Sequence, residues 1–151
     1  MNIFKTISAF FLAVTVAFSV VILPSCDDED DDDNHNQSES DYHAHIHSPD
    51  SIDKHVGDTL HIHIEFEDHN NGKVHNVGVK IYNRDSTAQV VYDEQSHVHA
   101  DTSYTYMDDF ILSNANGVAA HTNWTLEAKV WGHESDTDGL VTDMVKFHVL
   151  P

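Results

Sequence analysis

Polar and apolar side chains alternate strictly along Thr59–Asp68, the stretch TLHIHIEFED. The apolar positions are Leu60, Ile62, Ile64 and Phe66, and the polar positions between them are His61, His63, Glu65 and Glu67. Because successive side chains of a β-strand point to opposite faces, this period of two predicts a strand. One of its faces is apolar and needs a second layer to cover it. The other face carries imidazoles and carboxylates.

Shorter segments with the same alternation recur along the chain. They lie at residues 42–47, 77–81, 90–92, 124–130 and 145–149, and two further short strands are expected between residues 97 and 112, where Asp108 interrupts the pattern. No segment after residue 41 has a long apolar period of 3.6 residues, so essentially no helix is expected. About seven short strands at this spacing predict an all-β fold, a single immunoglobulin-like Greek-key β-sandwich over residues 42–151.

The first 26 residues resemble a bacterial lipoprotein signal peptide. A short basic start precedes the apolar run 7–23, and Leu23-Pro24-Ser25-Cys26 has the order of a lipobox. The resemblance implies that residues 1–25 are removed and that Cys26 is lipidated as the mature N-terminus. The apolar run also approaches the length of a membrane span, so an uncleaved anchor is the alternative.

An unbroken acidic run, DDEDDDD at residues 27–33, follows Cys26. Like charges repel one another and bury little apolar surface, so residues 26–41 are expected to form a disordered acidic tether. Its position resembles the surface-export signal of Bacteroidota lipoproteins. This resemblance implies an outer membrane lipoprotein that is held by its lipid anchor and exposed on the cell surface.

Two segments of the predicted sandwich resemble the small immunoglobulin-like lipoprotein domains of Bacteroidota. They are Gly57-Asp58-Thr59-Leu60, before a strand, and WTLEAKVWGHESDTDG, before the last strand. The resemblance implies a fold and a cell-surface setting, and it carries over no catalytic residue. No nucleophile motif and no glycine-rich phosphate loop occurs in the sequence, so the protein is not expected to be an enzyme.

The formal net charge is −19, with 7 basic and 26 acidic residues. A charge of this sign argues against nucleic acid as a partner and favours cations. Fourteen histidines accompany it, thirteen of them at or after His43. Four His-x-His pairs occur, at His43/His45, His45/His47, His61/His63 and His97/His99. Imidazoles at i and i+2 of a strand lie about 6.6 Å apart on one face, close enough to share a metal ion.

The sharpest hypothesis is a divalent metal site on two paired strands. The first two strands of an immunoglobulin-like sandwich usually pair antiparallel, which would place both sets of histidines outward on one sheet. The expected ligands are His61 and His63, with one or two of His43, His45 and His47. Three imidazoles and a water suit zinc, and copper is the strongest competitor. Dense carboxylates are expected to raise the imidazole pKa values.

A possible second metal site draws on loops expected at one end of the sandwich. Its residues are His97, His99, Asp68, His69, His133, Asp136 and Asp138. Histidines there suit zinc or copper, and oxygen ligands alone suit calcium. An ordinary acidic loop is the alternative. The chain as a whole also has an alternative function, as an adhesion module that contacts a glycan or an unidentified surface protein and in which the histidines are incidental. An outward-facing Trp131 would favour a glycan.

Overall fold

The computed structural model describes residues 40–133 and 139–151. Its elements are β1 (Tyr42–Ser48), β2 (Lys54–His55), β3 (Thr59–Asp68), β4 (Lys73–Asn83), β5 (Val90–Asp101), β6 (Ser103–Ile111), the 3₁₀ turn η1 (Asn114–Asn116), β7 (Thr122–Trp131) and β8 (Val141–Leu150). Within these residues no helix is long and apolar enough to cross a membrane.

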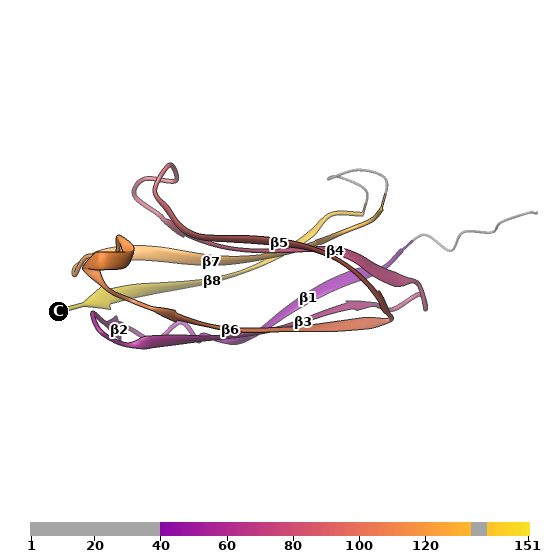
Figure 1. Cartoon of the computed structure of the whole chain (residues 1–151), viewed down its shortest axis with the longest axis horizontal. Coiled ribbons are helices and arrows are strands. Elements are labelled where there is room, and N and C mark those ends of the chain that lie inside the picture. The colour runs from indigo at the N-terminus through magenta and orange to yellow at the C-terminus, as the bar shows by residue number, and fades with distance from the viewer. Residues whose placement is uncertain (1–39, 134–138) are drawn as a thin grey trace, which may run out of the picture. The chain divides into compact units, whose positions relative to one another are not determined.

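The strands form two layers (Figure 1). One is a three-stranded sheet in the order β1-β3-β6, and the other is a five-stranded sheet in the order β2-β8-β7-β4-β5. β1, β3 and β6 lie in one layer and β4, β7 and β8 in the other, which is the distribution of strands in an immunoglobulin-like Greek-key sandwich. The predicted fold class is confirmed.

The core lies between the two layers and is built from the apolar sides of the alternating strands. Its fully buried side chains include Trp124, Phe66, Leu60, Ile62, Ile64, Ile81, Leu112 and Leu126. Each apolar position of Thr59–Asp68 is buried, as the period of two predicts. The chain has a single cysteine, so packing and hydrogen bonds hold the described sandwich without a disulfide.

The two short strands expected between residues 97 and 112 are instead the end of β5 and the whole of β6. β5 runs without a break for 12 residues and β6 for 9. β5 is an edge strand whose side chains are mostly exposed, so its sequence carries little alternation and its length could not be read from the pattern.

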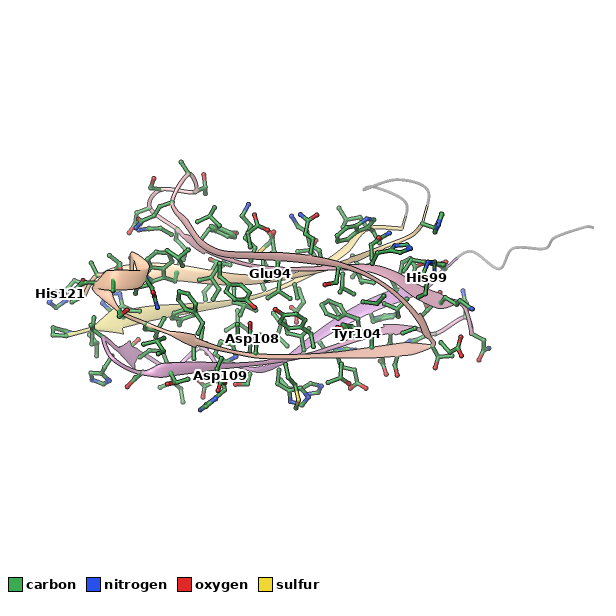
Figure 2. All side chains as sticks on the ribbon, viewed as in Figure 1. Glu94, His99, Tyr104, Asp108, Asp109 and His121 are labelled. Atoms are coloured by element: carbon green, nitrogen blue, oxygen red, sulfur yellow. The ribbon has the colours of Figure 1, made fainter. Side chains whose placement is uncertain are left out.

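Asp108 interrupts the alternation of β6 for a structural reason. Its carboxylate accepts a hydrogen bond from the Tyr92 hydroxyl of β5, and the same hydroxyl contacts that of Tyr106. Figure 2 shows Asp108 on the side of β6 that faces the other sheet and Asp109 on the opposite side. β5 and β6 are the edges of their sheets, so this network joins the two layers where the sandwich is open.

Candidate functional site

Four imidazoles, which we call the imidazole cluster, gather at one end of the five-stranded sheet. They are His75 of β4, His97 and His99 of β5, and His133, two residues after the end of β7. Ring nitrogens of His97, His99 and His133 all lie within 4.8 Å of one another. The Nε2 atoms of His97 and His99 are 2.6 Å apart, and the Nδ1 atoms of His75 and His99 are 3.2 Å apart. Figure 2 places His99 at the end of the sandwich opposite His121.

A bulge in the β4–β5 pairing brings the fourth imidazole into the cluster. Val74 pairs with Ala100 and Asn76 with His97, so His75 alone faces two residues of β5. His99, one of those two residues, has φ 51°, a left-handed conformation that is uncommon for residues other than glycine. Bulges re-aim side chains in this way. His75 belongs to no His-x-His pair, and no spacing in the sequence indicated it.

Asn76 fixes the orientation of two cluster members. Its Oδ1 lies 2.7 Å from Nδ1 of His97, and its amide nitrogen donates to the carbonyl oxygen of Gly132 at 2.6 Å. Because the amide donates to Gly132, its oxygen is left to accept the Nδ1 proton of His97. The lone pair of His97 is then on Nε2, which points to His99. Partners of this kind hold metal-binding imidazoles in the correct tautomer.

Burial lowers the pKa of His75, and the neighbouring imidazoles and Lys73 lower it further. Burial also lowers the pKa of His99, and the rings of His97 and His133 and then Lys73 lower it further. The expectation that carboxylates raise the imidazole pKa values is therefore wrong for these two residues, because their neighbours are other imidazoles and a lysine. A lowered pKa keeps the rings neutral, which is the form that binds metal.

The outer face of the three-stranded sheet carries the five histidines predicted as the main site. β1 pairs antiparallel with β3, as predicted, and both sets of histidines point outward. The register, however, puts His45 opposite Glu65 and His43 opposite Glu67. The one close pair of imidazoles between the strands is His47 and His63, with ring centroids 4.9 Å apart. Within the described ranges no three of the five bring ring nitrogens within 4.8 Å of one another.

Four of these five imidazoles, all except His63, lie near carboxylates. Nδ1 of His61 lies 2.6 Å from Oδ1 of Asp109, and Nε2 of His47 lies 3.3 Å from Oε2 of Glu65. The hydrogen bond with His69 lowers the pKa of Glu67, and the nearby rings of His45 and His43 lower it further. Imidazole–carboxylate pairs therefore cover most of this face.

A second group combines members of the two predicted sites. Ligand atoms of Asp41, His43 and His69 lie within 4.8 Å of one another, and the rings of His43 and His69 stack with centroids 4.1 Å apart. The possible second site is thus divided, with His97, His99 and His133 in the imidazole cluster and His69 beside His43. Asp136 and Asp138 lie outside the described residues.

Asp68, one of the residues predicted for the second metal site, makes hydrogen bonds to the backbone. It is buried, and its Oδ1 accepts hydrogen bonds from the backbone nitrogens of Asp41 and Asn70. These bonds close the turn between β3 and β4 and tie it to the start of β1. Asp68 therefore holds the backbone of Asp41, which belongs to the Asp41–His43–His69 group.

Trp131 faces outward but is only partly exposed. A Cβ atom at Gly78 would come within 3.3 Å of its ring, so the indole lies against the backbone of β4. Trp124, of opposite parity, is fully buried in the core. The indole therefore covers a strand and offers only part of its surface to a ligand.

No protein-family model matches this chain, and no curated protein matches it. Among solved structures, a CARDB domain from Pyrococcus furiosus, crystallised in complex with di-metal ions, is 12% identical over 74% of this chain and 96% of that one, with a TM-score of 0.45. A chain of the human complex of Zinc 2-glycoprotein and Prolactin inducible protein is 9% identical over 76% and 98%, with a TM-score of 0.44. A β-glucosidase from Listeria innocua is 10% identical over 74% of this chain and only 16% of its own, with a TM-score of 0.41. These likenesses are too distant to bear on function.

Proposed function

We propose that this chain is a non-enzymatic surface lipoprotein whose sandwich binds a divalent transition metal ion, zinc or copper, at the imidazole cluster. The observation that carries the proposal is the convergence of ring nitrogens from His97, His99 and His133 within 4.8 Å. His75 adds a fourth ring, 5.2 Å from that of His99 and 5.3 Å from that of His133.

The spacing of the nitrogens suits a tetrahedral ion after small ring movements. Zinc holds imidazole nitrogens at about 2.0–2.1 Å, which places two such nitrogens about 3.4 Å apart. The Nε2 atoms of His97 and His99 are 2.6 Å apart, and one nitrogen each of His97, His99 and His133 lies within 4.8 Å of the others, so these three rings need to move by about 1–1.5 Å to hold one ion. His75 contacts the other nitrogen of His99, its Nδ1, at 3.2 Å. Nitrogen ligands without carboxylates favour zinc or copper over calcium.

Calorimetric titration of Zn²⁺ and Cu²⁺ into the purified chain tests the site. His97→Ala/His99→Ala removes two ligands and is expected to weaken binding by at least about 100-fold, since loss of supporting partners alone costs 10–100-fold. The matched control is His121→Ala/His148→Ala, which removes an imidazole pair with ring centroids 6.4 Å apart outside the cluster. The control should bind like the parent.

Two outcomes contradict the proposal. Equal losses in both double variants would place binding at no defined cluster. Binding no tighter than millimolar in the parent would exclude a metal function and favour the adhesion alternative.

The lipoprotein part of the proposal rests on the Leu23-Pro24-Ser25-Cys26 motif and the acidic run 27–33. Lipidation of Cys26 would anchor the chain in the outer membrane, with the metal-binding domain outside the cell. Labelled fatty acid should be incorporated into the parent chain and not into Cys26→Ser. Incorporation into both would contradict it.

A further inference from the structure

One row of side chains crosses the outer face of the three-stranded sheet without a carboxylate at any of its three positions. On β3 and β6, His63 is paired with Met107. On the other side of β3, the ring of His47 lies 4.9 Å from that of His63. The adjacent rows, by contrast, each contain a carboxylate. His61 of β3 is paired with Asp109 of β6, and His45 of β1 is paired with Glu65 of β3.

His63 has no hydrogen bond to another side chain among residues 40–133 and 139–151, unlike its neighbours His47 and His61. The irregularity in the β1–β3 register between Ile46 and Ser48 brings His47 beside it. The bulge therefore places the ring of His47 next to His63, the imidazole of this face that contacts no carboxylate.

Met107 is 70% exposed, so its thioether contributes little to the core. Directly opposed residues in an antiparallel pair have Cβ atoms about 4.5–5.5 Å apart, and methionine has three rotatable bonds. The thioether can therefore reach the ring of His63. A shallow hollow of about 410 Å³, lined in part by His61, His63, Met107 and Asp109, opens to solvent at this point.

We propose that His63, Met107 and the ring nitrogen of His47 that does not contact Glu65 form a binding site for monovalent copper. Thioether sulfur is a soft ligand that selects Cu(I), while imidazole binds copper in general. Two imidazole nitrogens and one thioether sulfur give a three-coordinate set. This site uses no residue of the imidazole cluster and goes beyond the function proposed above, because its ion, its ligands and its sheet are different.

The test measures Cu(I) binding under anaerobic conditions by competition with a chromogenic Cu(I) chelator. All variants carry Cys26→Ser, which removes the only thiol, and His97→Ala/His99→Ala, which removes the competing imidazoles. Met107→Leu keeps the size of the side chain and removes the sulfur. Met144→Leu is the matched control, because Met144 is also exposed, at 44%, but lies on β8 of the other sheet.

Met107→Leu is expected to weaken Cu(I) binding by at least about tenfold, the lower end of the loss seen when a mere supporting partner is removed. Met144→Leu should bind like the parent. X-ray absorption of the one-to-one Cu(I) complex should show a sulfur neighbour in the parent and in Met144→Leu, and none in Met107→Leu. His63→Gln should weaken Cu(I) binding to a similar extent.

Parent-like Cu(I) affinity in Met107→Leu, or a sulfur neighbour that persists in it, would overturn the site. So would a parent complex without a sulfur neighbour. None of these outcomes bears on the imidazole cluster, which is tested separately by Zn²⁺ titration of the chain with His97 and His99 intact. Unchanged thermal unfolding of Met107→Leu would verify that the fold is retained.

Discussion

The two sheets present histidine in opposite surroundings. On the three-stranded sheet, ring nitrogens of His45, His47 and His61 lie 3.8, 3.3 and 2.6 Å from carboxylate oxygens. At the end of the five-stranded sheet, imidazoles contact other imidazoles, with nitrogens 2.6 and 3.2 Å apart. Both regions are rich in histidine, so the number of histidines does not distinguish them. Their neighbours do.

The difference has a chemical consequence. A carboxylate that bonds an imidazole occupies the ring nitrogen a metal would need. In the imidazole cluster, burial and neighbouring positive groups lower the pKa of His75 and His99, and Asn76 leaves Nε2 of His97 without a proton. The imidazole cluster therefore keeps ring nitrogens free of carboxylates, whereas the imidazoles of the three-stranded sheet mostly form pairs with carboxylates. His63 is the exception on that sheet.

Among variants that keep every histidine, the largest effect is expected from removing the side chain that orients His97. Asn76→Ala removes the acceptor of the His97 Nδ1 proton and the donor to Gly132, so the affinity for Zn²⁺ should fall about 10–100-fold. Asp109→Ala removes the partner of His61, and the Zn²⁺ affinity should stay unchanged. Calorimetry measures both. A similar loss in the two variants would erase the distinction between the regions.

A second variant tests whether the sheets act independently. Tyr92→Phe removes the hydroxyl that bonds Asp108 and Tyr106 across the open edge of the sandwich, and should lower the free energy of unfolding by about 1 kcal/mol. Burial and the hydrogen bond to Asp108 raise the pKa of this hydroxyl, which is consistent with a protonated donor. Urea denaturation measures the loss. A simultaneous fall in Zn²⁺ affinity would show that the edge couples the sheets.

A smaller effect should appear in the pH dependence of the metal-free protein. The folded-state pKa values of His75 and His99 lie below 6.5, so as the pH falls through 6.5 the unfolded chain takes up protons first. The free energy of unfolding should be unaffected well above that pH and should decline below it. His75→Gln/His99→Gln should show a shallower decline in urea denaturation. A slope identical to that of the parent would contradict the assignment.

The smallest effect is expected on the three-stranded sheet. The pKa of Glu67 is held below 4.5, so its stabilising contribution is present above that pH and is lost as the pH falls through the lower folded-state value. Glu67→Gln should lower the urea midpoint slightly at about pH 6, since exposed pairs contribute little. The difference from the parent should shrink as the pH is lowered from about 6 to about 3. A difference of equal size at both pH values would exclude the ion pair as its cause.

The sequence determined the strands that have one buried face. Leu60, Ile62, Ile64 and Phe66 are all fully or almost fully buried, and His61 and His63 face outward. This follows from alternation, which is a property of neighbouring residues and needs no knowledge of the partner strand. The same reasoning could not give the length of β5, because both sides of this edge strand are mostly exposed.

Only the tertiary structure decided which side chains meet. Alternation fixes the face of a strand, but a slip of two residues keeps every side chain on its face. Such a slip between β1 and β3 would put His45 opposite His63, whereas the observed register puts it opposite Glu65. Hydrogen bonds between residues distant in sequence hold this register. The Tyr42 hydroxyl donates to the carbonyl oxygen of Lys73, and the backbone nitrogen of Asp41 donates to Oδ1 of Asp68.

The imidazole cluster depends on the same kind of contact. The His97/His99 pair is visible in the sequence, but His75 joins it only because one residue of β4 faces two of β5. His133 joins it because β7 pairs Trp131 with Asn76, which brings the end of β7 beside the bulge. The bulge has no local signature in the sequence of β5, because the apolar residues beside it, Val98 and Ala100, are only partly buried and enforce the register weakly. The sequence therefore shows which residues could bind a metal, and the long-range register of the strands decides which of them come together.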